Sequence, residues 1–172
     1  LLQSSAASDV YKRQVEKIAF NEKVSPEDFI LLRAAALFHD SGYIDKYLDN
    51  ETIGVNYARD FLPKYGFNLS QVNKVCELIM ATKVPQKPKN NLERIICDAD
   101  LDYLGREDFI SISSDFYKEL KEYRMVKNKK EWDQIQIKFL KGHLFFTSYS
   151  VIKRSFLKKK NLELIKDRVV KN

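Results

Sequence analysis

Apolar residues recur at helical spacing along most of this 172-residue chain. One such stripe, within residues 70–83, consists of Val72, Val75, Leu78 and Ile79. No segment alternates apolar and polar residues in the way that a half-buried strand does. The pattern therefore predicts an all-α fold, built as a single-domain helical bundle.

Capping and helix-breaking residues divide this pattern into separate helices. Ser25, followed by Pro26 and two acids, is typical of a helix start, and Gly66 is typical of a stop. We expect Ser70 to cap the next helix, and the prolines of residues 84–90 to end it. Further helices are expected from about residue 92 through the acidic segment CDADLDYLG, and then over residues 107–123, 130–147 and 147–166.

Residues 1–14, LLQSSAASDVYKRQ, differ from the rest of the chain. They are rich in serine and alanine, carry no amphipathic pattern as far as Asp9, and look like a translated junction sequence. We therefore expect a non-native leader over residues 1–14 and a helical domain over residues 15–172. The leader should pack poorly or only by accident, although the segment SDVYKRQVEKIA tolerates a helix back to about Asp9.

Composition excludes several classes of protein. The chain is 44% hydrophobic and 31% charged, and it has no apolar run of the ~20 residues that span a membrane. Cys76 and Cys97 both lie in apolar helical segments, which argues against a disulfide framework. We expect a cytoplasmic protein with no membrane partner.

The net charge of +6 is modest, and part of it falls in one late cluster of basic residues, Lys153, Arg154, Lys158, Lys159 and Lys160. Such a cluster is most often a solvated helix face, and no Gly-rich phosphate loop or RNA-binding motif accompanies it. We therefore do not expect a nucleic-acid partner.

The adjacent residues His39 and Asp40 are the first candidates for chemistry. They follow an apolar helical run and precede Gly42, and the chain has only two histidines. Neighbouring side chains on a helix diverge by about 100°, so both reach one ion only where the helix ends. An imidazole nitrogen beside a carboxylate suits a divalent transition metal or magnesium. The pair is either one half of a metal site or simply a polar helix end.

A second group of acids, Asp98, Asp100 and Asp102, lies in an apolar segment later in the chain. On one continuous helix, Asp98 and Asp102 would share a face and Asp100 would point elsewhere. Burying such acids without a cation or hydrogen bonds costs free energy. The segment is therefore a candidate for the other half of the same site.

These motifs resemble the HD-domain metal-dependent phosphohydrolases, in particular one bacterial branch. LFHDSGY and CDADLDYLG look like the two metal-binding motifs, and NETIGVNYARDFLPKYG, ATKVPQKP and KGHLFFT look like the segments between and after them. The resemblance covers residues 15–160. It implies a helical fold, a divalent metal ion (Mn, Mg, Fe, Co, Ni or Zn) and hydrolysis of a phosphate ester.

Carried over to this chain, the resemblance assigns the metal to His39, Asp40 and Asp100, with Asp98 as the rival of Asp100. The family's first histidine is missing. Its expected place is near Ala6, inside the leader, and Asn50 stands where many relatives have another histidine. The resemblance therefore implies a site that has lost one ligand.

Other residues receive roles by the same resemblance. Asp40, Asp45 and Glu51 are candidate catalytic groups, and Lys83 and His143 are candidate substrate contacts. Each has a plainer interpretation: a turn residue for Asp45, a helix-dipole acid for Glu51, a helix-end lysine for Lys83 and a structural histidine for His143.

The sequence thus predicts a metal-dependent phosphohydrolase or phosphodiesterase that acts on a small, nucleotide-like phosphate ester and is impaired by the missing histidine. The alternative is a non-catalytic module that uses the same scaffold to bind a nucleotide or a partner. The substrate, the metal and the oligomeric state stay open.

Overall fold

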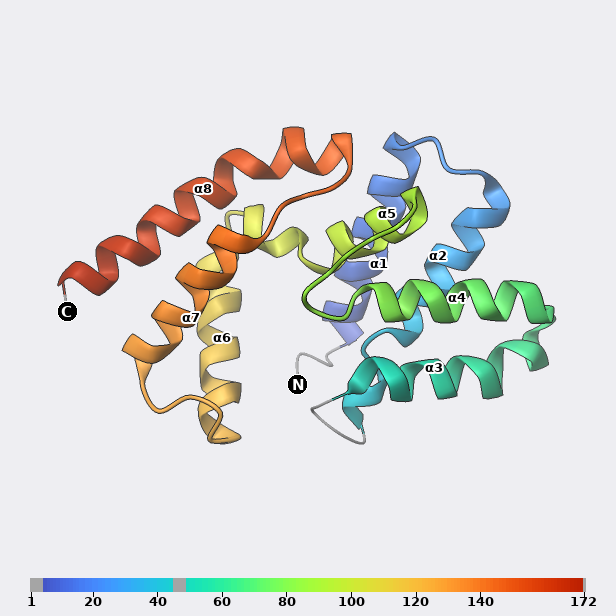
Figure 1. Cartoon of the computed structure of the whole chain (residues 1–172), viewed down its shortest axis with the longest axis horizontal. Helices are drawn as coiled ribbons and strands as arrows, with labels where there is room; N and C mark the ends of the chain where they lie inside the picture. Colours follow the sequence, from blue (N-terminus) through green and yellow to red (C-terminus); the bar gives the residue numbers. More distant parts are fainter. Residues whose placement is uncertain (1–4, 45–48, 172) are drawn as a thin grey trace. The chain divides into compact units, whose positions relative to one another are not determined.

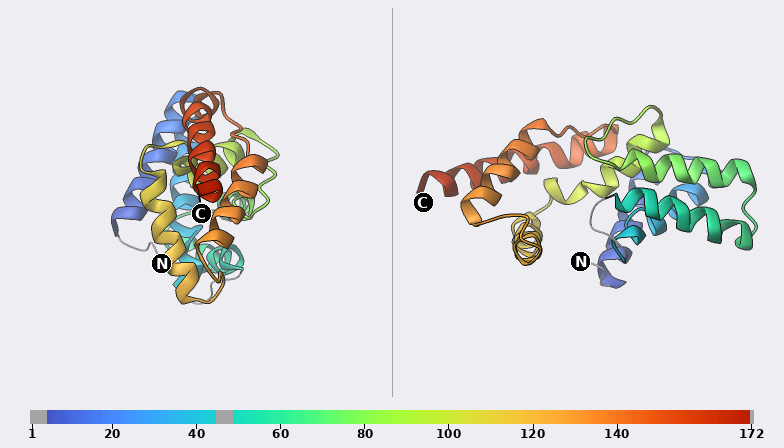
Figure 2. Two further views of the ribbon diagram at one scale, coloured as in Figure 1. Left: turned by 90° about the vertical axis from the view of Figure 1, so that its left-hand side faces the viewer. Right: turned by 60° about the horizontal axis from the view of Figure 1, so that its bottom comes forward.

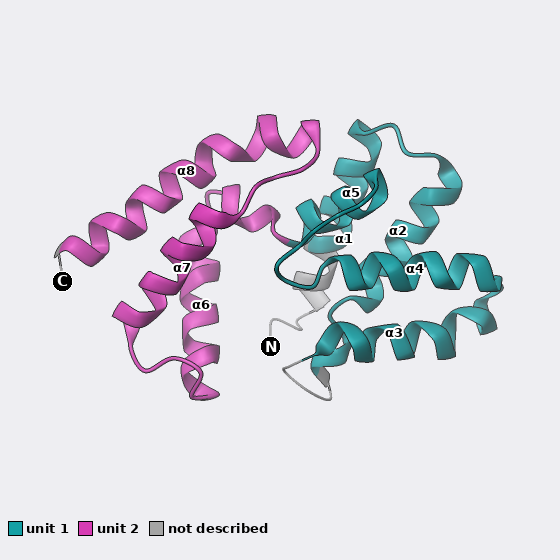
Figure 3. Cartoon of the chain, in the orientation of Figure 1, with its two compact units in different colours: residues 1–100 teal, residues 101–172 magenta. Residues whose placement is uncertain are grey.

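A computed structural model describes residues 5–44 and 49–171, which form eight α-helices and three short 3-10 helices (Figure 1). The described residues contain no β-strand, so the predicted all-α fold is confirmed. The chain divides into two compact units, residues 1–100 and 101–172 (Figure 3). The sequence pattern did not indicate this division.

Unit 1 contains α1 (Ser5–Asn21), α2 (Pro26–Phe38), η1 (Ser41–Ile44), α3 (Asn50–Phe61), η2 (Leu62–Tyr65), α4 (Leu69–Ala81) and α5 (Asn91–Asp100). Helices α3 and α4 lie side by side (Figures 1 and 2). The core of this unit includes Ile18, Leu32, Val75, Ile79 and Ile95, each without measurable exposure to solvent. The predicted stripe on α4 therefore faces the core.

The helix starts of unit 1 follow the capping rules, with one correction. The side chain of Ser25 accepts a hydrogen bond from the Asp28 N–H, and Pro26 is the first helical residue of α2, as predicted. Helix α4 is capped by Asn68 and not by Ser70. Asn68 and Gln71 exchange side-chain and backbone hydrogen bonds, and this reciprocal pair satisfies two end groups where a lone serine would satisfy one.

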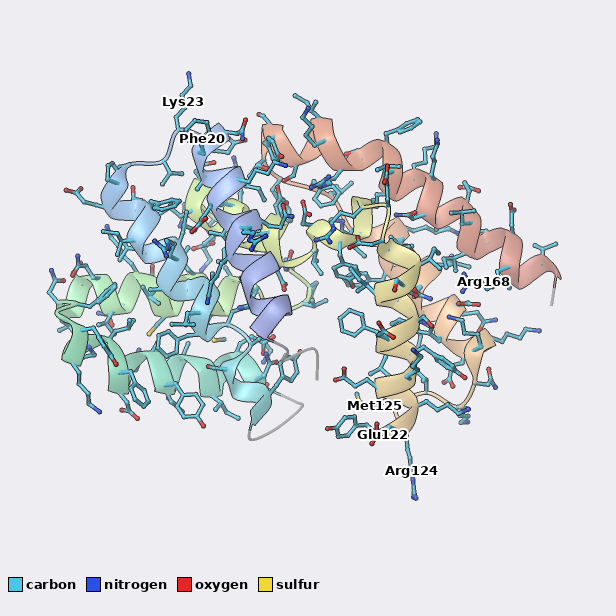
Figure 4. The ribbon with its side chains drawn as sticks, turned by 180° about the vertical axis from the view of Figure 1, so that it is seen from behind. Phe20, Lys23, Glu122, Arg124, Met125 and Arg168 are labelled. Atoms are coloured by element: carbon cyan, nitrogen blue, oxygen red, sulfur yellow. The ribbon has the colours of Figure 1, made fainter. Side chains whose placement is uncertain are left out.

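Two sharp turns use residues in the left-handed backbone region. Lys23, after α1, has a φ of 55°, and Arg124, after α6, has a φ of 57°. Figure 4 shows Phe20 and Lys23 extending from the end of α1, and Glu122, Arg124 and Met125 gathered at the end of α6. These side chains mark the helix ends and lie outside the cores.

Unit 2 contains η3 (Asp102–Gly105), α6 (Phe109–Glu122), α7 (Lys129–Gly142) and α8 (Ser148–Lys171). Its core is formed by Leu101, Leu104, Phe109, Leu140, Phe145 and Ile165. A side chain at Gly105 would place its Cβ 2.5 Å from the Arg154 carbonyl oxygen, so the glycine allows η3 to approach α8 closely. Helix α7 ends five residues before the predicted boundary at residue 147, and α8 runs to Lys171 and not to residue 166.

The acidic segment is not one continuous helix, which corrects a second prediction. Helix α5 ends at Asp100, Leu101 leaves the helical region with φ −106° and ψ 15°, and Asp102 begins η3. Asp98 and Asp102 therefore do not share a helix face. Asp102 instead accepts a hydrogen bond from the Arg154 Nε at 2.6 Å within unit 2.

Two further predictions concern the cysteines and the membrane. Cys76 and Cys97 are both free, buried thiols. Among the described residues, no helix combines the length and the apolar character that crossing a membrane requires.

Candidate metal centre

His39 is the C-cap of α2, directly after its last helical residue, and its ring is buried. Its Nδ1 lies 3.1 Å from the carbonyl oxygen of Ala36. A carbonyl oxygen only accepts hydrogen bonds, so Nδ1 carries a proton, and Nε2 is the ring atom that other groups can use. This is the tautomer that a metal ligand with a free Nε2 requires.

The Nε2 atom of His39 faces two carboxylates. Asp40 Oδ2 lies 3.0 Å away and Asp100 Oδ1 lies 3.7 Å away. Asp40 is adjacent in sequence and half-exposed, whereas Asp100 comes from the end of α5 and is largely buried. The structure thus brings together the three side chains that the sequence selected.

The electrostatics of this cluster shift two pKa values. Burial lowers the pKa of His39, but the carboxylates of Asp40 and Asp100 outweigh it and raise the pKa to about 8. Burial raises the pKa of Asp100 to about 7, with Asp40 and Glu51 adding to the rise and His39 and Gln86 opposing it. The two carboxylates therefore outnumber the one imidazole that can neutralise them, and this imbalance favours binding of a cation.

Tyr11, on α1, covers one face of the His39 ring. The ring centroids are 4.1 Å apart with an interplanar angle of 21°, and the Tyr11 hydroxyl donates to the Ile96 carbonyl oxygen at 3.3 Å. Burial and the nearby Asp100 and Asp40 raise the pKa of Tyr11 well above its usual value. Tyr11 lies within the expected leader and packs against a candidate metal ligand, and the assignment of residues 1–14 to a non-native leader stays a prediction.

The backbone around His39 is held by η1 and α3. The Asn50 side-chain amide donates to the His39 carbonyl oxygen at 3.3 Å, and Asn50 is buried. A Cβ on Gly42 would lie 2.0 Å from the Asn50 carbonyl oxygen, so only glycine permits this approach. Asn50 therefore fixes the turn in which Asp40 lies.

Gln86 is a site residue that the residue-by-residue sequence reasoning missed. Its Nε2 donates to Asp100 Oδ2 at 2.9 Å. The residue lies in the proline-flanked connection between α4 and α5, inside the segment ATKVPQKP. That segment was the one available signal, because a single neutral glutamine between two prolines has no charge or spacing that a pattern would reveal.

Three of the four remaining predicted residues of unit 1 lie within the described residues. Glu51 is in the first turn of α3 and raises the pKa of Asp100. Lys83 is exposed and forms a 2.6 Å salt bridge with Asp49; this hydrogen bond raises the pKa of Lys83. Asp98 is fully buried within α5, and Asp100, not Asp98, makes the ion pair with His39. Asp45 lies outside the described residues.

His143 belongs to unit 2 and follows α7 in an extended conformation, so the prediction of a helical histidine is wrong. Its ring meets Phe145 edge-on with centroids 4.7 Å apart. Lys158 donates to the His143 carbonyl oxygen and places its Nζ 3.4 Å from Nδ1. Burial and Lys158 lower the pKa of His143 to about 4. These contacts describe a core histidine, and its role toward a substrate stays a prediction.

The chemistry and spacing of the first cluster fit a divalent ion, although the set is incomplete. Among the described residues, no three His, Cys, Asp or Glu side chains already form a metal-binding arrangement. However, ligand atoms about 2.0–2.3 Å from one ion lie roughly 3–4 Å from each other, and the two distances from His39 Nε2, 3.0 and 3.7 Å, fall in that range. His39, Asp40 and Asp100 would need only small side-chain adjustments to share an ion.

Comparison with known proteins supports the fold. No protein-family model and no curated protein matches the chain. Its structure is similar to the crystal structure of a predicted HD superfamily hydrolase from an uncultured Thermotogales bacterium, with a TM-score of 0.55 and 20% sequence identity. The match covers 98% of this chain and 78% of that chain. At this identity the likeness shows the fold alone, an all-helical fold similar to that of the Thermotogales protein.

Proposed function

We propose that this protein is a metal-dependent phosphohydrolase or phosphodiesterase whose substrate is a small, nucleotide-like phosphate ester. The observation that carries the proposal is the convergence of His39 Nε2 on the carboxylates of Asp40 and of the sequence-distant Asp100. The HD-type fold supports it. The resemblance of the motifs LFHDSGY and CDADLDYLG to the metal-binding motifs of that family adds to it.

In this proposal His39, Asp40 and Asp100 hold one divalent ion. A bound ion of this kind polarises a phosphoryl oxygen and acidifies water. Lys83 offers a cation to the substrate phosphate, after release from Asp49. Asp40, Asp45 and Glu51 are the candidates for proton transfer, and Glu51 already lies within electrostatic reach of Asp100.

We further propose that the centre is impaired in this chain. The centre contains one histidine, His39, and the ring of Tyr11 stacks on one face of the His39 ring. Loss of a direct ligand should weaken metal binding by more than the roughly 10–100-fold that loss of a supporting group costs. Ala6, the position suggested by counting along the sequence, and Tyr11, the position that contacts His39, are the two places at which to restore an imidazole.

One observation favours the second candidate, a non-catalytic module that binds a nucleotide or a partner. The His39 Nε2 already has a carboxylate partner, Asp40 Oδ2, at 3.0 Å. A protonated His39 paired with Asp40 would be a stable arrangement without any ion. A stoichiometric metal ion in the purified protein would argue against this candidate.

The test compares the wild-type chain with Tyr11→His, Ala6→His and Asp40→Ala. Each protein is titrated with Mn²⁺ and assayed with Mn²⁺, Mg²⁺, Co²⁺ or Ni²⁺ against a generic phosphodiester and a panel of nucleotides. We expect feeble hydrolysis by the wild type, gain of metal and turnover in one histidine variant, and loss of both in Asp40→Ala. If neither histidine variant binds metal or hydrolyses any substrate, the enzyme proposal is wrong.

A further inference from the structure

We infer that Gln86 is a positioning residue of the candidate metal centre: it holds one oxygen of Asp100 so that the other oxygen faces His39. The inference rests on the proposed function, because it concerns the same centre. It adds a residue whose side chain would not itself bind the ion.

The two oxygens of Asp100 have different partners. Oδ2 accepts a hydrogen bond from the Gln86 Nε2 at 2.9 Å, whereas Oδ1 is the atom 3.7 Å from the His39 Nε2. A carboxylate with one oxygen occupied in this way presents a single oxygen to an ion. Gln86 therefore selects a one-oxygen binding mode for Asp100 and fixes the rotation of its carboxylate.

The Gln86 amide is itself anchored. The same Nε2 lies 3.3 Å from the carbonyl oxygen of Thr82, the C-cap residue of α4. Thr82 is buried, and its hydroxyl donates to the Ile79 carbonyl oxygen at 2.8 Å. Gln86 is thus held by the end of α4, and it fixes in turn the carboxylate of Asp100 at the end of α5.

The other end of the amide provides a second, independent observation. Gln86 Oε1 is shielded from solvent and has no hydrogen-bond partner among the described residues. A buried amide oxygen without a donor is unfavourable, and this one belongs to the group that contacts Asp100. The contacts of Nε2 with Asp100 and Thr82 therefore hold the amide in this orientation against the cost at Oε1.

The experiment replaces Gln86 by methionine, which has a similar length and provides neither the donor nor the acceptor. The matched control is Gln71→Met, because Gln71 is also a glutamine of unit 1 and its side chain supports the cap of α4. Mn²⁺ affinity is measured by electron paramagnetic resonance in the wild-type and Tyr11→His backgrounds, and the Co²⁺ absorption spectrum reports the geometry of the ligands.

We expect Gln86→Met to weaken Mn²⁺ binding by about tenfold and to change the Co²⁺ spectrum, with little change in the melting temperature of the metal-free protein. Gln71→Met should lower the melting temperature and leave Mn²⁺ affinity and the Co²⁺ spectrum unchanged. This contrast separates positioning of Asp100 from a general loss of stability.

Failure of the proposed function and failure of the inference on Gln86 give different results in this experiment. If Mn²⁺ binds neither background, the proposed function fails, and this inference fails with it. If Mn²⁺ binds the wild type or Tyr11→His and Gln86→Met has the same affinity and spectrum, the inference alone is wrong. An equal loss of affinity in Gln71→Met would also overturn it, because the effect would then be one of stability.

Discussion

Asp100 and Asp102 are two positions apart in the sequence, yet their side chains differ in exposure and in the charge of their partners. Asp102, in unit 2, has a side chain only 1% exposed and accepts a hydrogen bond from Arg154, a permanent cation, at 2.6 Å. Asp100, in unit 1, is 23% exposed, and its partners are His39 and the neutral amide of Gln86. One acid is neutralised within the fold; the other keeps partners that a metal ion can replace.

The two histidines show the same contrast. His39 faces two carboxylates, and its pKa is raised to about 8, whereas His143 faces the ammonium of Lys158 and its pKa is lowered to about 4. His143 also packs against Phe145 in the core. Residue type alone therefore does not define a site, because the charge of the neighbouring side chains separates a candidate metal ligand from a core residue.

The largest expected effect comes from breaking the Asp102–Arg154 pair. Arg154→Met leaves a buried carboxylate with Arg106 4.0 Å away, and removing one partner of a buried ion pair costs about 3–5 kcal/mol in the free energy of unfolding. Asp100→Asn should change that free energy by less than about 1 kcal/mol, because His39 keeps the closer carboxylate of Asp40 at 3.0 Å and no buried charge is left without a partner. Urea unfolding followed by fluorescence of Trp132, which lies in unit 2, measures the first effect.

Circular dichroism recorded during the same urea titration also reports the unfolding of unit 1, which contains Asp100. Metal binding should show the reverse order, with Asp100→Asn losing Mn²⁺ and Arg154→Met keeping it. Equal destabilisation by the two substitutions would contradict the division of the two acids into a structural and a functional one.

The next effect concerns pH and His143. Folded His143 takes up a proton near pH 4, whereas a histidine in the unfolded chain does so near pH 6.5. As pH falls from 6.5 to 4, the unfolded state binds the proton first, so the free energy of unfolding decreases, by up to about 3 kcal/mol. Comparing wild type with His143→Gln at pH 7 and pH 4.5 isolates this contribution. An identical pH dependence in the two proteins would show that His143 titrates normally.

The smallest predicted effect compares two glycines. Gly42→Ala would place a Cβ 2.0 Å from the Asn50 carbonyl oxygen, so we expect a loss of about 1–3 kcal/mol and weaker Mn²⁺ binding, because Asn50 also holds the His39 carbonyl. Gly142→Ala meets nothing within 4 Å at the end of α7 and should be neutral or stabilising by about 0.5–1 kcal/mol. Melting temperatures of the two variants test the difference; similar values would contradict the tight approach at Gly42.

Much of the fold could be predicted because the relevant signals are local. Helical spacing and caps such as Ser25 act within one or two turns, so the sequence carries them directly. The adjacency of His39, Asp40 and Gly42 marked the end of α2 for the same reason. The convergence of Asp100 on His39 was predicted from the resemblance and from the acidic motif, not from spacing alone.

The rest depends on tertiary contacts that no local pattern contains. Asn68 displaces Ser70 as the cap because Gln71 can reciprocate. The break at Leu101 separates Asp100 from Asp102, although the acids looked like one helical group. Gln86 could not be predicted as a site residue, because its role depends on a hydrogen bond to Asp100 at the end of α5.

The most direct test uses the fact that the chain has only two histidines. Long-range ¹H–¹⁵N spectra of the imidazole rings are recorded with and without saturating Zn²⁺, for the wild type and Asp100→Asn. We expect Zn²⁺ to shift the Nε2 resonance of His39 and to leave that of His143 in place, and we expect Asp100→Asn to reduce the shift. A His39 resonance unaffected by Zn²⁺, or equal shifts of the two histidines, would contradict a metal centre at His39, Asp40 and Asp100.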